Sequence, residues 1–173
     1  MHIGIMGIGD VAKSFINVIN KDDHVLYAYA RNPKMLDNII FNKISSDAQS
    51  IIESHSVNTI IDLLSHSDEA VEVSREIIKK SLTNGKNVIT SNKKLMKRYG
   101  KELCDYANKS KGSLYINSLT SSSDNFDAFP VYLSTNNFNE INEKYNIFSY
   151  RGAGPEEVAL SINQEIERIG SNK

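Results

Sequence analysis

The sequence predicts an α/β fold in which a doubly wound, mostly parallel sheet is covered by helices on both faces. Two observations predict it. Short apolar runs alternate with segments of helical periodicity up to about residue 117, and this is the rhythm of parallel strands joined by right-handed crossovers. The length of 173 residues is that of about one domain with a single core.

The first element is an apolar strand that runs through a glycine turn into a helix, within residues 2–20. Gly7 suits a tight turn, Gly9 lets the backbone approach a pyrophosphate, and Ala12 fills the last position of the G-x-G-x-x-G/A pattern. The N–H groups and partial positive charge at the start of a helix favour phosphate binding. We therefore expect a Rossmann-like dinucleotide site that contains Gly7, Ile8, Gly9, Asp10 and Val11.

Asp10 is the unusual residue of this turn. Its carboxylate would repel a bound pyrophosphate, whereas without a ligand it would satisfy the free N–H groups of the helix. We expect Asp10 to be the N-cap of the first helix rather than a catalytic residue.

The second expected strand covers residues 24–30 and ends at Arg31. At this position of dinucleotide-binding folds an Asp or Glu binds the ribose 2′-hydroxyl, whereas an arginine accommodates a 2′-phosphate. Arg31 therefore favours NADP over NAD. The alternative interpretation is a solvated arginine at the end of a strand.

The remaining elements follow from apolar runs, helical spacing and turn residues. We expect further strands at residues 39–44, 59–64, 86–90 and 113–117. We expect helices at residues 10–20 and 47–54, a long helix after Asp68 that ends at Asn84-Gly85, and a helix that opens at residues 90–93 and breaks at Gly100. The long helix carries apolar residues at helical spacing: Ala70, Val73, Ile77, Ile78 and Leu82.

The C-terminal part changes in composition. Residues 118–125 are rich in serine and indicate a loop, and two strands are expected at residues 129–133 and 145–150. A second glycine turn at residues 151–155 precedes a last helix with Val158, Ile162, Ile166 and Ile169. We expect a nucleotide-binding domain at residues 1–125, with the two strands and the returning helix of residues 126–173 packed on it.

Two further candidates lie in loops. Ser65 and His66 follow the strand at residues 59–64, at the edge where open α/β sheets bind ligands, and Ser65 could hydrogen-bond a cofactor ribose. Gly152 and Gly154 form a second candidate phosphate or carboxylate site before the last helix, or only a turn.

Composition narrows the class of partner and the compartment. Lys and Arg number 20, Asp and Glu 21, and the net charge of −1 gives no reason to expect nucleic acid or an anionic membrane. The single cysteine, Cys104, is expected in the core, which is consistent with a reducing cytosol. No apolar run of about 18 residues, secretory signal or metal-ligand spacing is visible, so we expect a cytoplasmic protein without a metal.

Four segments, taken in order, resemble the homoserine dehydrogenases. They are residues 7–12, residues 61–64, the run Asn84-Gly85-Lys86-Asn87-Val88-Ile89-Thr90-Ser91-Asn92-Lys93, and residues 150–154. The resemblance implies an NADP-dependent oxidoreductase of amino-acid biosynthesis that forms a homodimer through residues 126–150. It also implies that Asn92 and Lys93 face the cofactor, and that Lys93 takes part in substrate binding and catalysis. The alternative for Lys93 is a solvated lysine at a helix start.

The sequence also departs from that family. Where the family continues through a glycine-rich loop into a large substrate and catalytic domain, this chain has the serine-rich loop and passes to the returning segment. The substrate domain is therefore expected to be missing. We expect an NADP-binding or regulatory subunit without homoserine dehydrogenase activity of its own, paired with a second copy or with a catalytic or full-length homologous subunit.

Two alternatives remain open. A small NADP-dependent oxidoreductase could use Lys93 on a compact substrate at a dimer interface. A degenerate domain could instead bind no cofactor, with Asp10 as a helix cap, and serve as a scaffold for protein contacts.

Overall fold

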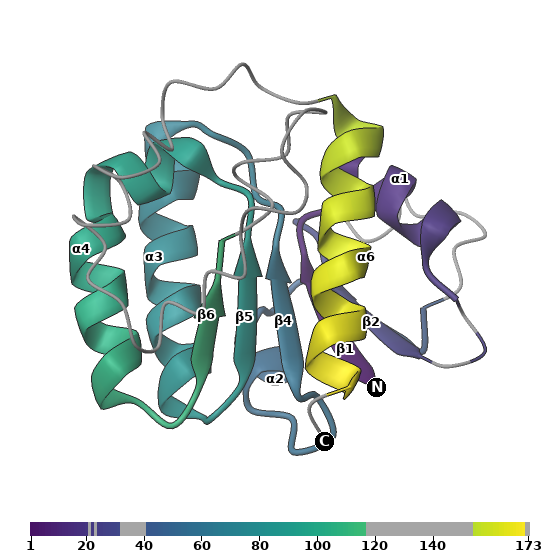
Figure 1. Cartoon of the computed structure of the whole chain (residues 1–173), viewed down its shortest axis with the longest axis horizontal. Helices are drawn as coiled ribbons and strands as arrows, with labels where there is room; N and C mark the ends of the chain where they lie inside the picture. Colours follow the sequence, from purple (N-terminus) through teal and green to yellow (C-terminus); the bar gives the residue numbers. More distant parts are fainter. Residues whose placement is uncertain (21, 23, 32–40, 117–153, 172–173) are drawn as a thin grey trace.

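The computed structural model describes residues 1–20, 22, 24–31, 41–116 and 154–171. Within them six strands form one parallel sheet in the order β3-β2-β1-β4-β5-β6 (Figure 1). This order is that of doubly wound dinucleotide-binding sheets, in which the direction of winding reverses between the first and fourth strands. The predicted α/β class is confirmed.

The strands end level with one another in the centre of the sheet. Their bounds are β1 His2–Met6, β2 Val25–Tyr29, β3 Lys43–Ser45, β4 Thr59–Asp62, β5 Asn87–Thr90 and β6 Ser113–Tyr115. In the ladder Met6 lies opposite both Tyr29 and Asp62, and Asp62 lies opposite Thr90. The loops that leave these four strands therefore start side by side at the carboxyl edge of the sheet.

Five helices cover the two faces of the sheet among the described residues. They are α1 Asp10–Val18, α2 Gln49–Ile52, α3 Asp68–Thr83, α4 Lys93–Lys109 and α6 Pro155–Ser171. One apolar cluster joins Phe15 of α1 and Ile162 of α6 to Ile3 of the sheet, and α1 and α6 lie side by side in Figure 1. A second cluster on the opposite face joins α2, α3 and α4 to the sheet. Each helix thus buries its apolar stripe against buried strands.

Two predicted elements differ in position or length. The strand expected at residues 39–44 corresponds to β3, Lys43–Ser45. Because β3 lies at the edge of the sheet, its sequence can be more polar than that of a central strand. The expected break at Gly100 is wrong, because α4 is continuous from Lys93 to Lys109. A glycine inside a helix costs only about 1 kcal/mol, which the burial of neighbours such as Leu103 outweighs.

The buried face of α3 also differs from the expected one. Val73 is 41% exposed, whereas Val71 and Ser74 are fully buried. Ser74 can be buried because its hydroxyl is hydrogen-bonded within the core. The buried face of α3 therefore includes a serine, and its hydroxyl takes part in the site described below.

Several expectations concern residues outside the described part of the chain. These are the end of the last sheet strand at Asn117, the loop at residues 118–125, the strands at residues 129–133 and 145–150, and the turn residue Gly152. The domain division at residue 125 stays a prediction for the same reason. Among the described residues, no helix is long and apolar enough to cross a membrane.

Candidate functional site

The fold itself requires a glycine at position 7. Gly7 has a φ angle of +97°, and a Cβ atom there would lie 2.7 Å from the carbonyl oxygen of Leu63. Its N–H donates to the carbonyl of Tyr29 at 3.0 Å. Gly7 therefore allows the close approach of the loops that follow β1 and β4.

Gly9 differs, because none of the residues that the structure describes requires glycine at this position. It is the N-cap of α1 with φ −93° and ψ −165°, angles open to any residue, and a Cβ there would meet no atom of residues 1–20, 22, 24–31, 41–116 and 154–171 within 4 Å. Ser and Asn are commoner at an N-cap than Gly. The open space in front of Gly9 is where a ligand could approach the backbone. The flanking Ile8 and Val11 are half-buried against the α1–α6 side of the core.

The expectation that Asp10 caps α1 is wrong. The N-cap is Gly9, whose carbonyl accepts the N–H of Lys13 at 3.1 Å, and α1 has no side-chain cap. Asp10 is the first helical residue. Its side chain is 84% exposed and lies 3.7 Å from the Lys13 ammonium. The carboxylate can therefore rotate away from the backbone of the glycine turn.

Arg31 is exposed, two residues beyond the end of β2. Tyr29, the last residue of that strand, is opposite Met6 and bonded to Gly7. The glycine turn and Arg31 thus emerge from adjacent strand ends. This is the relative placement of the phosphate turn and the ribose-binding position in dinucleotide folds.

Ser65 and His66 are exposed in the loop between β4 and α3. The hydroxyls of Ser65 and Ser67 lie 3.4 Å apart, and Ser67 caps α3 by accepting the N–H of Ala70. The loop begins directly beside Gly7, since Leu63 donates its N–H to the carbonyl of Met6 at 2.9 Å. Ser65 and His66 therefore stand at the same carboxyl edge as the glycine turn.

Asn92 and Lys93 occupy the junction of β5 and α4. Asn92 is 1% exposed and caps α4, since its Oδ1 accepts the N–H of Leu95 at 3.0 Å. Its Nδ2 is a buried donor that has no hydrogen-bond acceptor among the described residues. Such a donor costs about 1–3 kcal/mol unless an acceptor reaches it.

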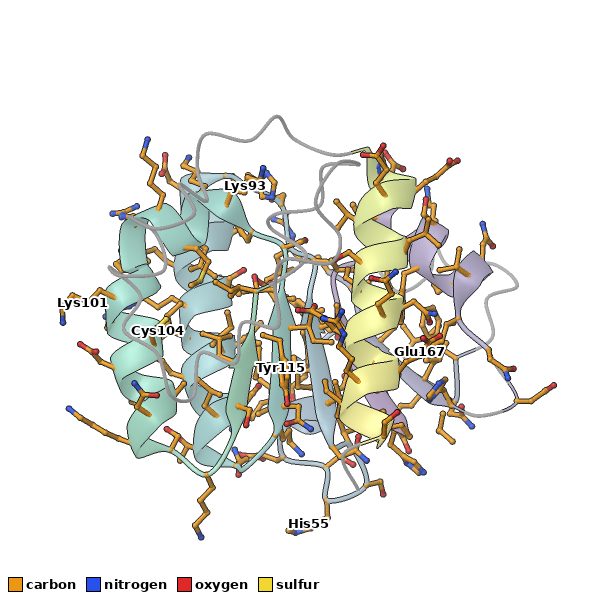
Figure 2. All side chains as sticks on the ribbon, in the orientation of Figure 1. His55, Lys93, Lys101, Cys104, Tyr115 and Glu167 are labelled. Carbon is orange, nitrogen blue, oxygen red and sulfur yellow. The ribbon has the colours of Figure 1, made fainter. Side chains whose placement is uncertain are left out.

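Lys93 is the first residue of α4 and is half-buried. Desolvation lowers the pKa of its ammonium group. Figure 2 places it at the opposite end of the molecule from His55, at the carboxyl edge of the sheet. The first turn of α4 carries no acidic residue, in contrast to the first turns of α1, α3 and α6.

The second glycine turn is a poorer anion site. Gly154 is exposed and precedes α6, and its N–H donates to the Glu157 carboxylate at 3.3 Å. Glu156 and Glu157 add negative charge to this helix start, which opposes a phosphate.

A buried carboxylate that was not predicted from the sequence lies beneath these loops. Asp62 ends β4 with no exposed surface and accepts hydrogen bonds from Ser74 and Thr90, each at 2.9 Å. Burial raises the pKa of Asp62, although the two hydroxyls and the N–H of Leu64 act in the opposite direction. The only sequence signal was an acid closing an apolar strand.

Cys104 lies in the core and not at the carboxyl edge of the sheet. Cys104 is 1% exposed in the cluster around α3 and α4, and burial raises the pKa of its thiol to about 12, as fits the predicted core position. Among the described residues, no group of three or more His, Cys, Asp or Glu side chains is placed to hold a metal ion.

The sheet order, the glycine turn and the loops at its carboxyl edge define a dinucleotide-binding domain. The comparison with known families agrees: residues 7–117 match the family described as homoserine dehydrogenase, NAD binding domain. The chain belongs to this family. No curated protein matches the sequence.

Solved structures show the same fold. A homoserine dehydrogenase from Thiobacillus denitrificans is 20% identical with a TM-score of 0.57, over 68% of this chain and 29% of that one. The homoserine dehydrogenase of S. aureus, solved at pH 8.5, is 20% identical with a TM-score of 0.56, over 68% of this chain and 32% of that one. This chain thus matches about a third of the length of these two proteins.

Proposed function

We propose that this chain binds NADP at the carboxyl edge of its sheet and acts as a cofactor-binding or regulatory subunit. Membership of the homoserine dehydrogenase NAD-binding family supports a nicotinamide dinucleotide. The choice of NADP and the role as a subunit go beyond the family and rest on the residues below.

Gly9 is the observation that carries the proposal. A Cβ at this position would meet no atom of the described residues within 4 Å, so that part of the fold gives no reason for glycine there. A pyrophosphate that contacts the backbone of residues 8–11 gives such a reason, because a Cβ would stand in its path. The donors would be the N–H groups in the first turn of α1.

Arg31 supports NADP over NAD. It is exposed just beyond β2, the strand next to the glycine turn, where an arginine would pair with a 2′-phosphate, whereas NAD would leave it without that contact.

The β5–α4 junction would receive the other half of the dinucleotide. NADP would supply the hydride chemistry, while this chain orients the cofactor. The buried Nδ2 of Asn92 would donate to an acceptor oxygen, and Lys93 would place a cation beside it. Ser65 and His66 would line the same crevice from the neighbouring strand end.

Hydride transfer also requires a substrate held in register with the cofactor. The residues above would hold the dinucleotide side of that arrangement, and the match covers only 29% and 32% of the two solved proteins. We therefore propose that these 173 residues alone do not oxidise homoserine, and that they act with a second copy or with a catalytic subunit.

One observation favours a second candidate, a small NADP-dependent oxidoreductase. Desolvation lowers the pKa of Lys93, which suits a lysine to proton transfer. The third interpretation, a scaffold without a cofactor, loses its structural argument because Asp10 does not cap α1.

Titration of the purified protein with NADPH and with NADH tests the proposal. We expect micromolar binding of NADPH, about −8 kcal/mol, and weaker binding of NADH. Absence of binding for both at millimolar concentration would leave only the scaffold. Homoserine-dependent reduction of NADP by the isolated protein, abolished in Lys93→Met, would favour the oxidoreductase. Light scattering of the same sample measures the expected dimer.

A further inference from the structure

The β5–α4 junction, which carries Asn92, is linked by hydrogen bonds to the buried carboxylate of Asp62. This carboxylate lies at the reversal point of the sheet, where β1 and β4 are neighbours and a dinucleotide would cross. None of the roles proposed above uses it. Its two oxygens are occupied differently: Oδ1 accepts from Ser74 at 2.9 Å and from the Leu64 N–H at 3.4 Å, and Oδ2 accepts from Thr90.

Thr90 connects this carboxylate to the β5–α4 junction. Its hydroxyl donates to Asp62 Oδ2 at 2.9 Å and accepts the backbone N–H of Asn92 at 3.2 Å. The direction of the O–H bond is set, because a carboxylate accepts and an N–H donates. All three residues are at most 1% exposed, so water does not compete for these contacts.

Asn92 is consequently held at two points. Thr90 fixes its backbone, and the N–H of Leu95 fixes its side-chain oxygen. With Oδ1 assigned as the acceptor, Nδ2 must point the other way as the donor. The orientation of that donor therefore depends on a chain of hydrogen bonds that begins at Asp62.

We propose that Asp62 is a positioning residue that acts through Thr90 to orient the side-chain amide of Asn92 toward an acceptor oxygen of the dinucleotide. The ligand part of this inference rests on the proposed function. The ligand-free part, that Asp62 and Thr90 together set the geometry of Asn92, stands on the contacts alone.

Ser74 provides a matched control. Like Thr90, it is fully buried and gives one hydroxyl to Asp62 at 2.9 Å, yet it lies on α3 and has no contact with Asn92 among the interactions described. Ser74→Ala and Thr90→Val each remove one donor from the same carboxylate. Only Thr90→Val also removes the acceptor of the Asn92 N–H.

The test compares these variants by NMR of the ¹⁵N-labelled, ligand-free protein. We expect Thr90→Val to raise the exchange rate of the Asn92 backbone amide at least about tenfold and to shift its side-chain NH₂ signals. Ser74→Ala should change that rate less than about twofold, and Thr90→Ser should restore wild-type behaviour. In each protein, the thermal midpoint is measured so that a general loss of stability is seen separately.

Asp62→Asn is the second variant, should Thr90→Val not fold. Its amide has one acceptor oxygen, which the two donors on the Ser74 side would draw, leaving Nδ2 to face Thr90. We expect the Asn92 signals to change as in Thr90→Val.

NADPH titration of the same variants completes the test. We expect about five- to tenfold weaker binding in Thr90→Val and less than twofold change in Ser74→Ala. Unchanged Asn92 exchange in Thr90→Val and Asp62→Asn, or equal changes in Ser74→Ala, would overturn the positioning role. If the exchange result holds and the wild type binds neither NADPH nor NADH, the proposed function fails and the positioning of Asn92 stands.

Discussion

Asp10 places a negative charge at the start of the helix that would hold the pyrophosphate. Replacing it with threonine should therefore tighten NADPH binding by about two- to fivefold, the effect typical of one charge at a helix terminus. Isothermal titration measures it. Asp105→Asn is a suitable control. Asp105 is also exposed and paired with a lysine of the same helix, but it lies on α4, away from the glycine turn. Equal or weaker binding in Asp10→Thr would show that the carboxylate does not face the phosphates.

Arg31 is the residue that should set the choice of cofactor. With the 2′-phosphate as its partner, Arg31→Ala should weaken NADPH binding by about tenfold or more and leave NADH binding within about twofold. The ratio of the two dissociation constants is the measurement. A parallel loss for both cofactors would contradict a 2′-phosphate contact.

Asp62 should leave a signature in the pH dependence of stability. Its pKa in the folded protein is raised above the ordinary 3.8 by burial, so between these two values the folded state holds more protons than the unfolded state. The free energy of unfolding of the wild type, relative to Asp62→Asn, should therefore fall as the pH rises from about 4 toward the raised pKa, and then level off.

Denaturant unfolding between pH 4 and 8 measures this difference. His66 interacts electrostatically with Asp62, so the pair of proteins is compared again with His66→Gln. A difference that grows with pH would mean that the hydrogen bonds of Ser74, Thr90 and Leu64 outweigh desolvation.

At the scale of elements, Lys86 joins the end of α2 to the start of β5. Its ammonium group donates to the carbonyls of Ser54 at 2.9 Å and Val57 at 2.5 Å, in a position only 5% exposed. Lys86→Met would remove the ammonium donor from both carbonyls, and among the described residues only that of Ser54 keeps another, the N–H of Val57 at 3.2 Å. We expect a loss of about 1–3 kcal/mol in unfolding free energy.

Lys80 is the control for this prediction. It also reaches α2, through Gln49 Oε1 at 3.0 Å, but on the exposed surface. Lys80→Met should change the stability by less than about 0.5 kcal/mol. Equal effects of the two substitutions on the urea midpoint would show that the buried contacts of Lys86 add nothing.

The central elements could be predicted from the sequence because parallel strands buried on both faces are apolar throughout. All four residues of β4 are buried, and the apolar run at residues 59–64 predicted this strand. The edge strand β3 was displaced because it has a partner on one side only, so its sequence carries less of that signal.

The candidate site was predictable where it depends on backbone and not where it depends on buried polar side chains. Gly7 and Gly9 carry a spacing that follows from the turn they form. Asp62, Thr90 and Ser74 come from three different elements. Ser74 is 12 positions and Thr90 28 positions from Asp62 along the chain, and no sequence pattern predicts hydrogen bonds over such separations. Likewise, whether Asp10 or Gly9 is the N-cap depends on which carbonyl accepts the first helical bond.

At the scale of the whole molecule, the sheet brings residues from four strand ends to one edge. The glycine turn follows β1, and Arg31 follows β2. The Ser65-His66 loop follows β4, and the Asn92-Lys93 junction follows β5. Because the winding reverses between β1 and β4, the helices that follow them leave this edge on opposite faces of the sheet, and in open α/β sheets extended ligands bind at such a point. The proposed dinucleotide would span this reversal point.

The most direct test of this account compares Gly9→Ala with Gly7→Ala. Alanine at position 9 meets no atom in the described part of the chain, so the free energy of unfolding should stay within about 1 kcal/mol of the wild type, while NADPH binding should weaken at least about tenfold. Alanine at position 7 has a positive φ and approaches Leu63, so it should cost about 1–3 kcal/mol of stability. Wild-type NADPH affinity in a folded Gly9→Ala protein would contradict the account.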